Sequence, residues 1–161
     1  MVMKDGLRFD SADEEETFKF GEALGLMAEK GDCFALYGTL GMGKSVLSRG
    51  FIKKLSGEGE VPSPTFTLVQ MYHAPNFEVY HYDLYRLKSP NELYELSIEE
   101  ALFQGVTLIE WPEKMGGLLP NDAFIVKITP AKDKRVIKIS CKDEKKLQRL
   151  DAFFEKGDPK A

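Results

Sequence analysis

The chain has 161 residues, with 22 Lys or Arg and 26 Asp or Glu, so its formal net charge at pH 7 is −4. This length fits one domain with its own core, and 43% apolar with 30% charged residues excludes a disordered or fibrous chain. The mild negative charge argues against a protein held on nucleic acid mainly by its own phosphate contacts.

The first third of the chain alternates short strands with amphipathic helices. A strand is expected at residues 7–10, and the sequence at 11–14 matches a capping box, which starts a helix. Gly31 follows that helix as its stop signal. A continuous apolar run over residues 33–37 predicts a strand buried on both faces. After a glycine-rich turn, a second amphipathic helix reaches about Leu55.

The middle of the chain begins with strands and continues with short helices. Residues 66–72 and 79–82 have strand character and are expected to form a hairpin. Two further capping boxes, at 89–92 and 97–100, predict two short helices within residues 90–103.

The last third is predicted to add strands and one helix. Residues 106–109 form another buried-strand candidate, and residues 123–129 and 135–141 alternate around a turn. Asp143 can cap a final helix. The element order predicts an α/β fold with a mixed, mainly parallel central sheet and a late β-hairpin. We expect a single domain over residues 1–155 and a flexible tail at 156–161.

Residues 38–45 read Gly-Thr-Leu-Gly-Met-Gly-Lys-Ser and match the phosphate-loop pattern G-x-x-x-x-G-K-[ST] at every fixed position. Glycines let successive amides point at an anion, Lys44 adds charge for the β- and γ-phosphates, and the Ser45 hydroxyl can ligate Mg²⁺. The bland alternative is a flexible turn with an exposed lysine. The flanking strand and helix favour the three-layer fold of phosphate-loop NTPases. The expected nucleotide-binding residues of this segment are Gly38, Leu40, Gly41, Met42, Gly43, Lys44, Ser45 and Val46.

Two acids follow predicted strands. Glu110 ends the strand at 106–109 and is a candidate for the magnesium shell, against the alternative of a solvated strand-end acid. Asp83 can orient the attacking water or complete the metal shell, or can simply start a turn.

Thr65 stands where nucleotide switches place a γ-phosphate sensor, or is an ordinary threonine at a strand entry. His81 is interpreted as a packed or hydrogen-bonded histidine without chemistry. Trp111 should lie near the site, with packing as its default role.

Four motifs occur in one order along the chain. They are the phosphate loop at 38–45, Ser-Pro-Thr-Phe-Thr-Leu-Val at 63–69, His-Tyr-Asp-Leu-Tyr-Arg-Leu at 81–87 and Ile-Glu-Trp-Pro-Glu at 109–113. Together they resemble the bacterial TsaE (YjeE) family, from about residue 11 to about residue 141. The resemblance implies an ATPase, binding ATP or ADP and Mg²⁺, that is required for the threonylcarbamoyl modification of adenosine next to the anticodon in certain tRNAs. It also implies a complex with TsaD-like and TsaB-like proteins, which carry the transfer chemistry.

The resemblance assigns roles residue by residue. The implied catalytic residues are Lys44, Asp83 and Thr65, and the implied metal ligands are Ser45, Glu110 and Asp83. Trp111 matches the tryptophan beside the nucleotide, and Glu14 and Lys134 are expected at the adenine. The family usually has Asp after the first glycine of the loop, Ala before the last, and Thr after the lysine. Here these positions hold Thr39, Met42 and Ser45, and Ser45 preserves the hydroxyl.

Two other functions remain open at this stage. A small-molecule kinase shares the phosphate loop, but such enzymes usually close an arginine-bearing lid, and the five arginines of this chain are scattered. A nucleotide-dependent switch that does not hydrolyse ATP has the same sequence signature as a slow ATPase. A GTPase is disfavoured because the chain lacks an N-K-x-D segment. Without a basic stripe, contact with tRNA is expected only indirectly, through the complex.

The sequence also indicates a compartment. Its longest apolar run, at 33–37, is far shorter than the ~20 residues of a membrane span. The first five residues contain an acid and no hydrophobic block, unlike a secretory signal. Cys33 and Cys141 are interpreted as buried free thiols, which favours the cytoplasm and no membrane partner.

Overall fold

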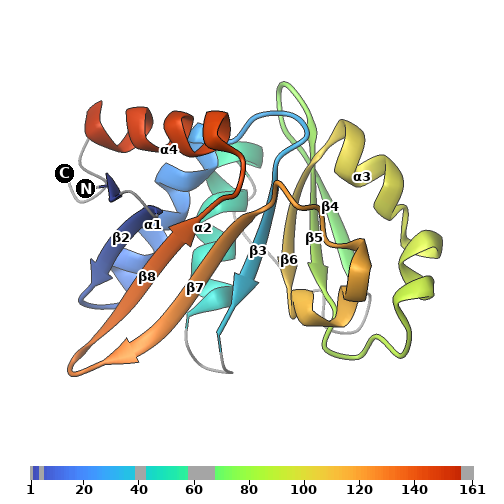
Figure 1. Ribbon diagram of the computed structural model, residues 1–161, viewed down its shortest axis with the longest axis horizontal. Helices are drawn as coiled ribbons and strands as arrows, with labels where there is room; N and C mark the ends of the chain where they lie inside the picture. Colours follow the sequence, from blue (N-terminus) through green and yellow to red (C-terminus); the bar gives the residue numbers. More distant parts are fainter. Residues whose placement is uncertain (1, 4–5, 39–42, 58–67, 157–161) are drawn as a thin grey trace.

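The computed structural model of the chain describes residues 2–3, 6–38, 43–57 and 68–156. Its strands form one 8-stranded sheet in the order β1-β2-β8-β7-β3-β6-β5-β4 (Figure 1). The strands are β1 Val2–Met3, β2 Gly6–Ser11, β3 Cys33–Tyr37, β4 Val69–His73, β5 Glu78–Asp83, β6 Val106–Glu110, β7 Phe124–Ala131 and β8 Lys134–Ser140.

The centre of the sheet is parallel and its flanks are antiparallel. Strand β3 pairs in parallel with β6 and β7, and β6 pairs in parallel with β5. The β4–β5 and β7–β8 hairpins and the β2–β8 pair are antiparallel. Parallel pairing brings the carboxyl ends of β3, β5 and β6 to one edge of the sheet, where ligands bind in open α/β folds.

Helices cover both faces of the sheet, as the predicted three-layer α/β fold requires (Figure 1). One face carries α1 (Glu14–Met27), α2 (Lys44–Ser56) and, against α1 and β2, α4 (Glu144–Lys156). The other face carries the short 3₁₀ helices η1 (Pro90–Leu96) and η2 (Pro112–Leu118) and the helix α3 (Ile98–Gln104). None of the described helices has the length and apolar character to cross a membrane.

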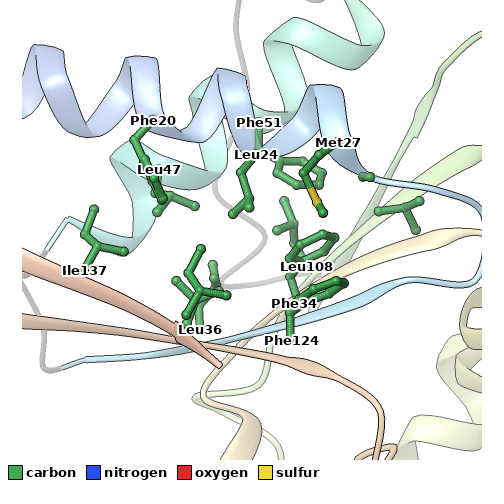
Figure 2. Packing of buried hydrophobic residues seen from close by; sticks show 14 of the residues in the cluster. Phe20, Leu24, Met27, Phe34, Leu36, Leu47, Phe51, Leu108, Phe124 and Ile137 are labelled. Atoms are coloured by element: carbon green, nitrogen blue, oxygen red, sulfur yellow. The ribbon is translucent and has the colours of Figure 1, made fainter. Parts of the chain in front are cut away.

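The larger core lies between the sheet and the α1–α2 pair, whose apolar side chains point onto the strands (Figure 2). Phe34 of β3 stacks on Phe124 of β7, with ring centroids 4.8 Å apart, and meets Phe51 of α2 edge-on at 5.1 Å. A Cβ on Gly50 of α2 would overlap the carbonyl oxygen of Phe18 in α1. This close approach fixes α2, and with it the phosphate-loop lysine, against α1.

Two of the predicted capping boxes are wrong. Asp13, not Ser11, caps α1: its Oδ1 accepts from the Glu16 amide at 2.9 Å, and Glu16 Oε1 accepts from the Ala12 amide at 2.8 Å. Ser11 is instead the last residue of β2, since it pairs there with Arg135.

Ser97 is also not a side-chain cap. Its amide closes η1 on the Leu93 carbonyl, its φ is 60°, and its side chain makes no capping hydrogen bond to α3. The remaining caps are confirmed: Ser89 Oγ accepts from the Asn91 amide at 3.4 Å, and Asp143 Oδ1 accepts from the Lys146 amide at 3.0 Å.

Smaller differences concern the ends and the thiols. Strand β1 and helix η2 were not predicted from the sequence, because a two-residue strand and a glycine-containing 3₁₀ turn have no periodicity to detect. Cys33 is buried as expected, whereas Cys141 is only half-buried; both are free. Residues 157–161 lie outside the described residues, so the flexible tail stays a prediction.

Candidate functional site

The start of helix α2 carries the strongest sequence motif and has no cap of its own. Gly43 occupies the N-cap position with φ 96°, a conformation that suits glycine, and contributes no side-chain hydrogen bond. The first turn of α2 contains no acid, in contrast to α1, which has three acids there and a capping aspartate. The amides at the start of α2 are therefore left for an anion, with the helix dipole aligned toward it.

Lys44 is the first residue of α2 and is only 5% exposed, so it is not the exposed lysine that the alternative of a flexible turn requires. Its Nζ lies 4.1 Å from the centroid of the Trp111 ring, and no carboxylate of the described residues lies within 4.0 Å of it. Burial lowers the pKa of Lys44, and the more distant carboxylates of Glu110, Glu113 and Asp83 oppose this shift. Within the described part of the chain, the ammonium thus has an aromatic partner but no close ion pair.

The two candidate acids end neighbouring parallel strands. Asp83 of β5 and Glu110 of β6 are register partners, and both are buried. Asp83 Oδ1 accepts from the Tyr85 amide at 3.1 Å. Glu110 Oε2 lies 2.6 Å from Nε2 of His81, which confirms the interpretation of this histidine as hydrogen-bonded.

Trp111 follows Glu110 with φ 60° and ψ 51°, a left-handed conformation that is unusual for a bulky residue. Its ring lies between two neighbours: the Lys44 ammonium, and the Tyr85 ring at 5.0 Å between centroids. Tyr85 is 50% exposed. The tryptophan therefore connects the phosphate-loop lysine to the surface segment that follows Asp83.

A cavity of about 630 Å³ collects most of these groups. Its volume lies within the range of small-molecule sites. The described residues predicted from sequence that line it are Glu14, Gly43, Lys44, Ser45, Val46, Asp83, Glu110, Trp111 and Lys134. It is bounded by the starts of α1 and α2, the ends of β5 and β6, and the β7–β8 turn.

Lys134, the first residue of β8, lines this cavity and also forms an ion pair with Asp10. Its Nζ lies 2.6 Å from Oδ2 of Asp10, and the other oxygen of this carboxylate, Oδ1, accepts from Nε of Arg8 at 2.9 Å. The hydrogen bonds from Arg8 and then Lys134 lower the pKa of Asp10 to about 2. Asp10 thus pairs with Lys134 beside this cavity.

Several predicted residues lie elsewhere. Gly38 lines a second cavity of about 310 Å³ on another side of Trp111, together with residues 128–130. Leu40, Gly41 and Met42, and with them Thr39, lie outside the described residues, as does Thr65.

The structure adds cavity residues that the sequence did not suggest, among them Asp13, Thr17, Asp133 and Arg135. Asp13 and Thr17 stand at the start of α1, Asp133 in the β7–β8 turn and Arg135 near the start of β8. A search for residues flanking the two adenine candidates would have found them. A role for His81 does not follow from the sequence, because its partner Glu110 depends on how β5 and β6 align.

The donor set fits magnesium better than a softer metal. Ser45, Asp83 and Glu110 all line the cavity and offer only oxygen ligands, which Mg²⁺ prefers. Among the described residues, no group of three or more His, Cys, Asp or Glu converges as a complete metal site. Mg²⁺ is usually held by one or two carboxylates together with substrate phosphates and water.

Comparison with known proteins supports the sequence resemblance. Residues 11–138 match the family model described as threonylcarbamoyl adenosine biosynthesis protein TsaE. Curated relatives named tRNA threonylcarbamoyladenosine biosynthesis protein TsaE include one from Rickettsia bellii, 47% identical over 116 residues (71% of this chain and 81% of the relative). The relative from Haemophilus influenzae is 36% identical, covering 88% of this chain and 93% of the relative. The one from Bacillus subtilis is 33% identical, covering 79% of this chain and 80% of the relative. The crystal structure of Bacillus subtilis YdiB matches with a TM-score of 0.77 and 25% identity, covering 97% of this chain and 99% of that one.

Proposed function

This chain belongs to the TsaE family, which takes part in threonylcarbamoyladenosine biosynthesis in tRNA, and we propose that it is a magnesium-dependent ATPase that switches a TsaD–TsaB-like complex. The observation that carries the proposal is the arrangement at the edge of the sheet: an uncapped helix start with a buried lysine faces two buried acids across one cavity.

In this proposal the phosphates of ATP lie at the start of α2. The free amides of the first turn and the Lys44 ammonium bind the β- and γ-phosphate oxygens. The cavity wall excludes part of the water from these charged groups. The adenine then extends toward the start of α1 and the β7–β8 turn, where Glu14 and Lys134 line the same cavity. Trp111 forms the wall beside the phosphates. When the phosphates bind, they attract the Lys44 ammonium, and Trp111 loses its contact with it.

Ser45 and the two acids would hold Mg²⁺ against the phosphates. An ion held by these residues would supply positive charge that offsets the charge of the ATP phosphates during hydrolysis. In our assignment Glu110 acts mainly on the metal shell, and Asp83 mainly orients the attacking water. Water adds to the γ-phosphorus as the bond to the β–γ bridging oxygen breaks, giving ADP and phosphate with release of a proton. Lys44 stabilises the charge that gathers on the bridging and γ-oxygens.

The switch rests on the chain of contacts from Lys44 through Trp111 to Tyr85. When phosphates attract the ammonium away from the indole, the pair of aromatic rings loses one of its supports, and the exposed segment after Asp83 can change its arrangement. We propose that residues 83–86, together with residues 64–66, which lie outside the described residues, meet the TsaD–TsaB-like partners, and that hydrolysis releases or resets the complex. We assign this activity to the cytoplasm, because both cysteines are free thiols.

The test combines turnover with binding. ATP hydrolysis is measured for the chain alone and with TsaD and TsaB, and the chain is titrated into the TsaD–TsaB pair without nucleotide, with ADP and with a non-hydrolysable ATP analogue. We expect stimulated hydrolysis and affinities that differ between nucleotide states by ~1–3 kcal/mol. Equal affinities in all three states, or tight binding of tRNA by this chain alone at physiological salt, would refute the switch. Transfer of phosphate to a small acceptor would indicate a kinase, and binding without hydrolysis in every mixture a passive switch.

A further inference from the structure

His81 forms a buried hydrogen bond beneath the two candidate acids. Its Nε2 lies 2.6 Å from Oε2 of Glu110, and the two side chains are 4% and 7% exposed. His81 and Asp83 project from the same face of β5, since they are two residues apart, and Asp83 is the register partner of Glu110. The imidazole therefore lies one residue pair deeper in the sheet than the acids, on the side of α2.

We propose that His81 is a positioning residue for Glu110, holding Oε2 so that the other oxygen, Oε1, keeps one orientation toward the magnesium shell. This inference rests on the proposed magnesium–nucleotide site. An ionised carboxylate only accepts hydrogen bonds, so Nε2 of His81 carries the hydrogen and donates it. Groups that hydrogen-bond a metal ligand fix its orientation, and their loss typically costs 10–100-fold in metal affinity.

Fold stability alone does not account for the pair. Replacing a buried polar or ionic pair by apolar side chains of similar volume is often neutral or stabilising, so the core does not require it. In addition, Nδ1 of His81 is buried and has no hydrogen-bond partner among the described residues. A buried polar atom without a hydrogen bond lowers the free energy of unfolding. A residue that serves only packing could be apolar and would avoid this loss.

The experiment compares His81→Leu, which removes the donor, with His81→Gln, whose amide can donate from a similar place. The single tryptophan, Trp111, reports binding through its fluorescence, since it contacts Lys44. We expect His81→Leu to bind ATP without metal within about twofold of the wild type. The Mg²⁺ concentration for half-maximal binding of metal to the ATP complex should rise ~10–100-fold, and His81→Gln should restore most of it. With Mn²⁺ in place of Mg²⁺, electron paramagnetic resonance should show the same loss directly.

Two controls separate positioning from packing. His73 forms an equally short bond, 2.6 Å to Glu78, at the opposite end of β5, and it is exposed. His73→Leu should leave the Mg²⁺ requirement unchanged. In a Glu110→Gln background, His81→Leu should add little to the loss of metal affinity, because its effect acts through that carboxylate. Additive losses in the double variant would overturn the proposal.

A measurement on the wild-type protein avoids any loss of folding. The chain has two histidines, so ¹⁵N-histidine spectra are readily assigned with the His73→Leu variant. We expect a hydrogen-bonded Nε2 proton on His81 that shifts in Glu110→Gln and again when Mg²⁺ joins bound ATP. A wild-type Mg²⁺ requirement in His81→Leu, a His81→Gln variant as impaired as His81→Leu, or a His81 signal indifferent to Mg²⁺ would each overturn the positioning role alone. Absence of any Mg²⁺–ATP binding by the wild type would instead refute the proposed function, and this inference with it.

Discussion

A buried charged residue lies beyond each end of strand β3, and the two differ in their ion pairing among the described residues. Before the strand, Asp32 is 2% exposed and accepts from two guanidinium nitrogens of Arg149, both at 2.8 Å, and from the Glu29 amide at 2.8 Å. Beyond the strand, Lys44 is 5% exposed and has no carboxylate within 4.0 Å among the described residues.

The difference separates stability from binding. A buried charge that is paired within the chain fixes the elements that carry it, here β3 and α4, whereas one without an ion pair keeps its electrostatic attraction for a ligand. Arg149 lies beyond residues 11–138, which match the family model, so the paired end involves a helix outside that match. The unpaired end lies within it.

The largest expected effect is at Lys44. In Lys44→Ala, ATP affinity should fall on the order of 100-fold, because a charged hydrogen bond of ~1.5–3 kcal/mol is lost, and hydrolysis should cease. The free energy of unfolding should change by less than about 1 kcal/mol, since only an aromatic contact is removed. Isothermal titration calorimetry, which does not depend on the Lys44–Trp111 contact, and thermal unfolding measure the two quantities. Retained activity in a folded variant would end the assignment of the phosphate site.

The two acids sharpen the description of the unpaired end. Asp83→Asn should reduce turnover on the order of 100-fold with a smaller change in ATP affinity, as expected for a group that orients water. Glu110→Gln should mainly weaken magnesium-dependent nucleotide binding. Single-turnover hydrolysis and nucleotide titrations at several Mg²⁺ concentrations distinguish them. Parallel losses of affinity and turnover in both variants would mean that the roles are not divided in this way.

The opposite result is expected at the paired end. Arg149→Met leaves Asp32 with its amide hydrogen bond and Lys146 at 3.6 Å, so the free energy of unfolding should fall by ~2–3 kcal/mol. ATP affinity should stay unchanged. Chemical denaturation is the measurement. Lys19→Met, which breaks an exposed pair with Glu15 at 3.4 Å, serves as the control and should cost no more than about 0.5 kcal/mol. A loss of ATP affinity in Arg149→Met would remove the separation between the two ends.

The smallest effect concerns Cys33, next to Asp32. Burial raises the pKa of its thiol to about 12, so at pH 8 the native protein should react with a thiol reagent at Cys33 only after unfolding. Mass spectrometry of the modified peptide follows the reaction. Rapid native-state labelling of Cys33 would show that this end opens readily.

Local signals allowed much of the fold to be predicted. The apolar run at Cys33–Tyr37 and the stripe of α2 gave these elements correctly, and the phosphate-loop motif located Lys44 and Ser45 in the cavity. Spacing within a segment carries such information because each element has its own period.

Contacts between distant segments were out of reach. Asp32 and Arg149 are 117 residues apart, and the partner of His81 follows from the register of β5 on β6. The same reason explains the capping error at Ser11, since pairing with Arg135 extends β2 through the predicted cap. Sequence spacing states which residues share a face, but not which faces meet.

Pairing of β2 with β8 has a consequence for how the protein is made. Residues 6–11 at the beginning of the chain meet residues 134–140 near its end, and the start of α1 and the β7–β8 turn lie on the same cavity. During translation, a nascent chain that stops before Lys134 already contains the phosphate loop but lacks the wall opposite it. Such late, non-local pairing slows folding relative to local contacts. On the proposed function, we therefore expect a chain that stops before Lys134 to bind ATP more weakly than one that includes β8.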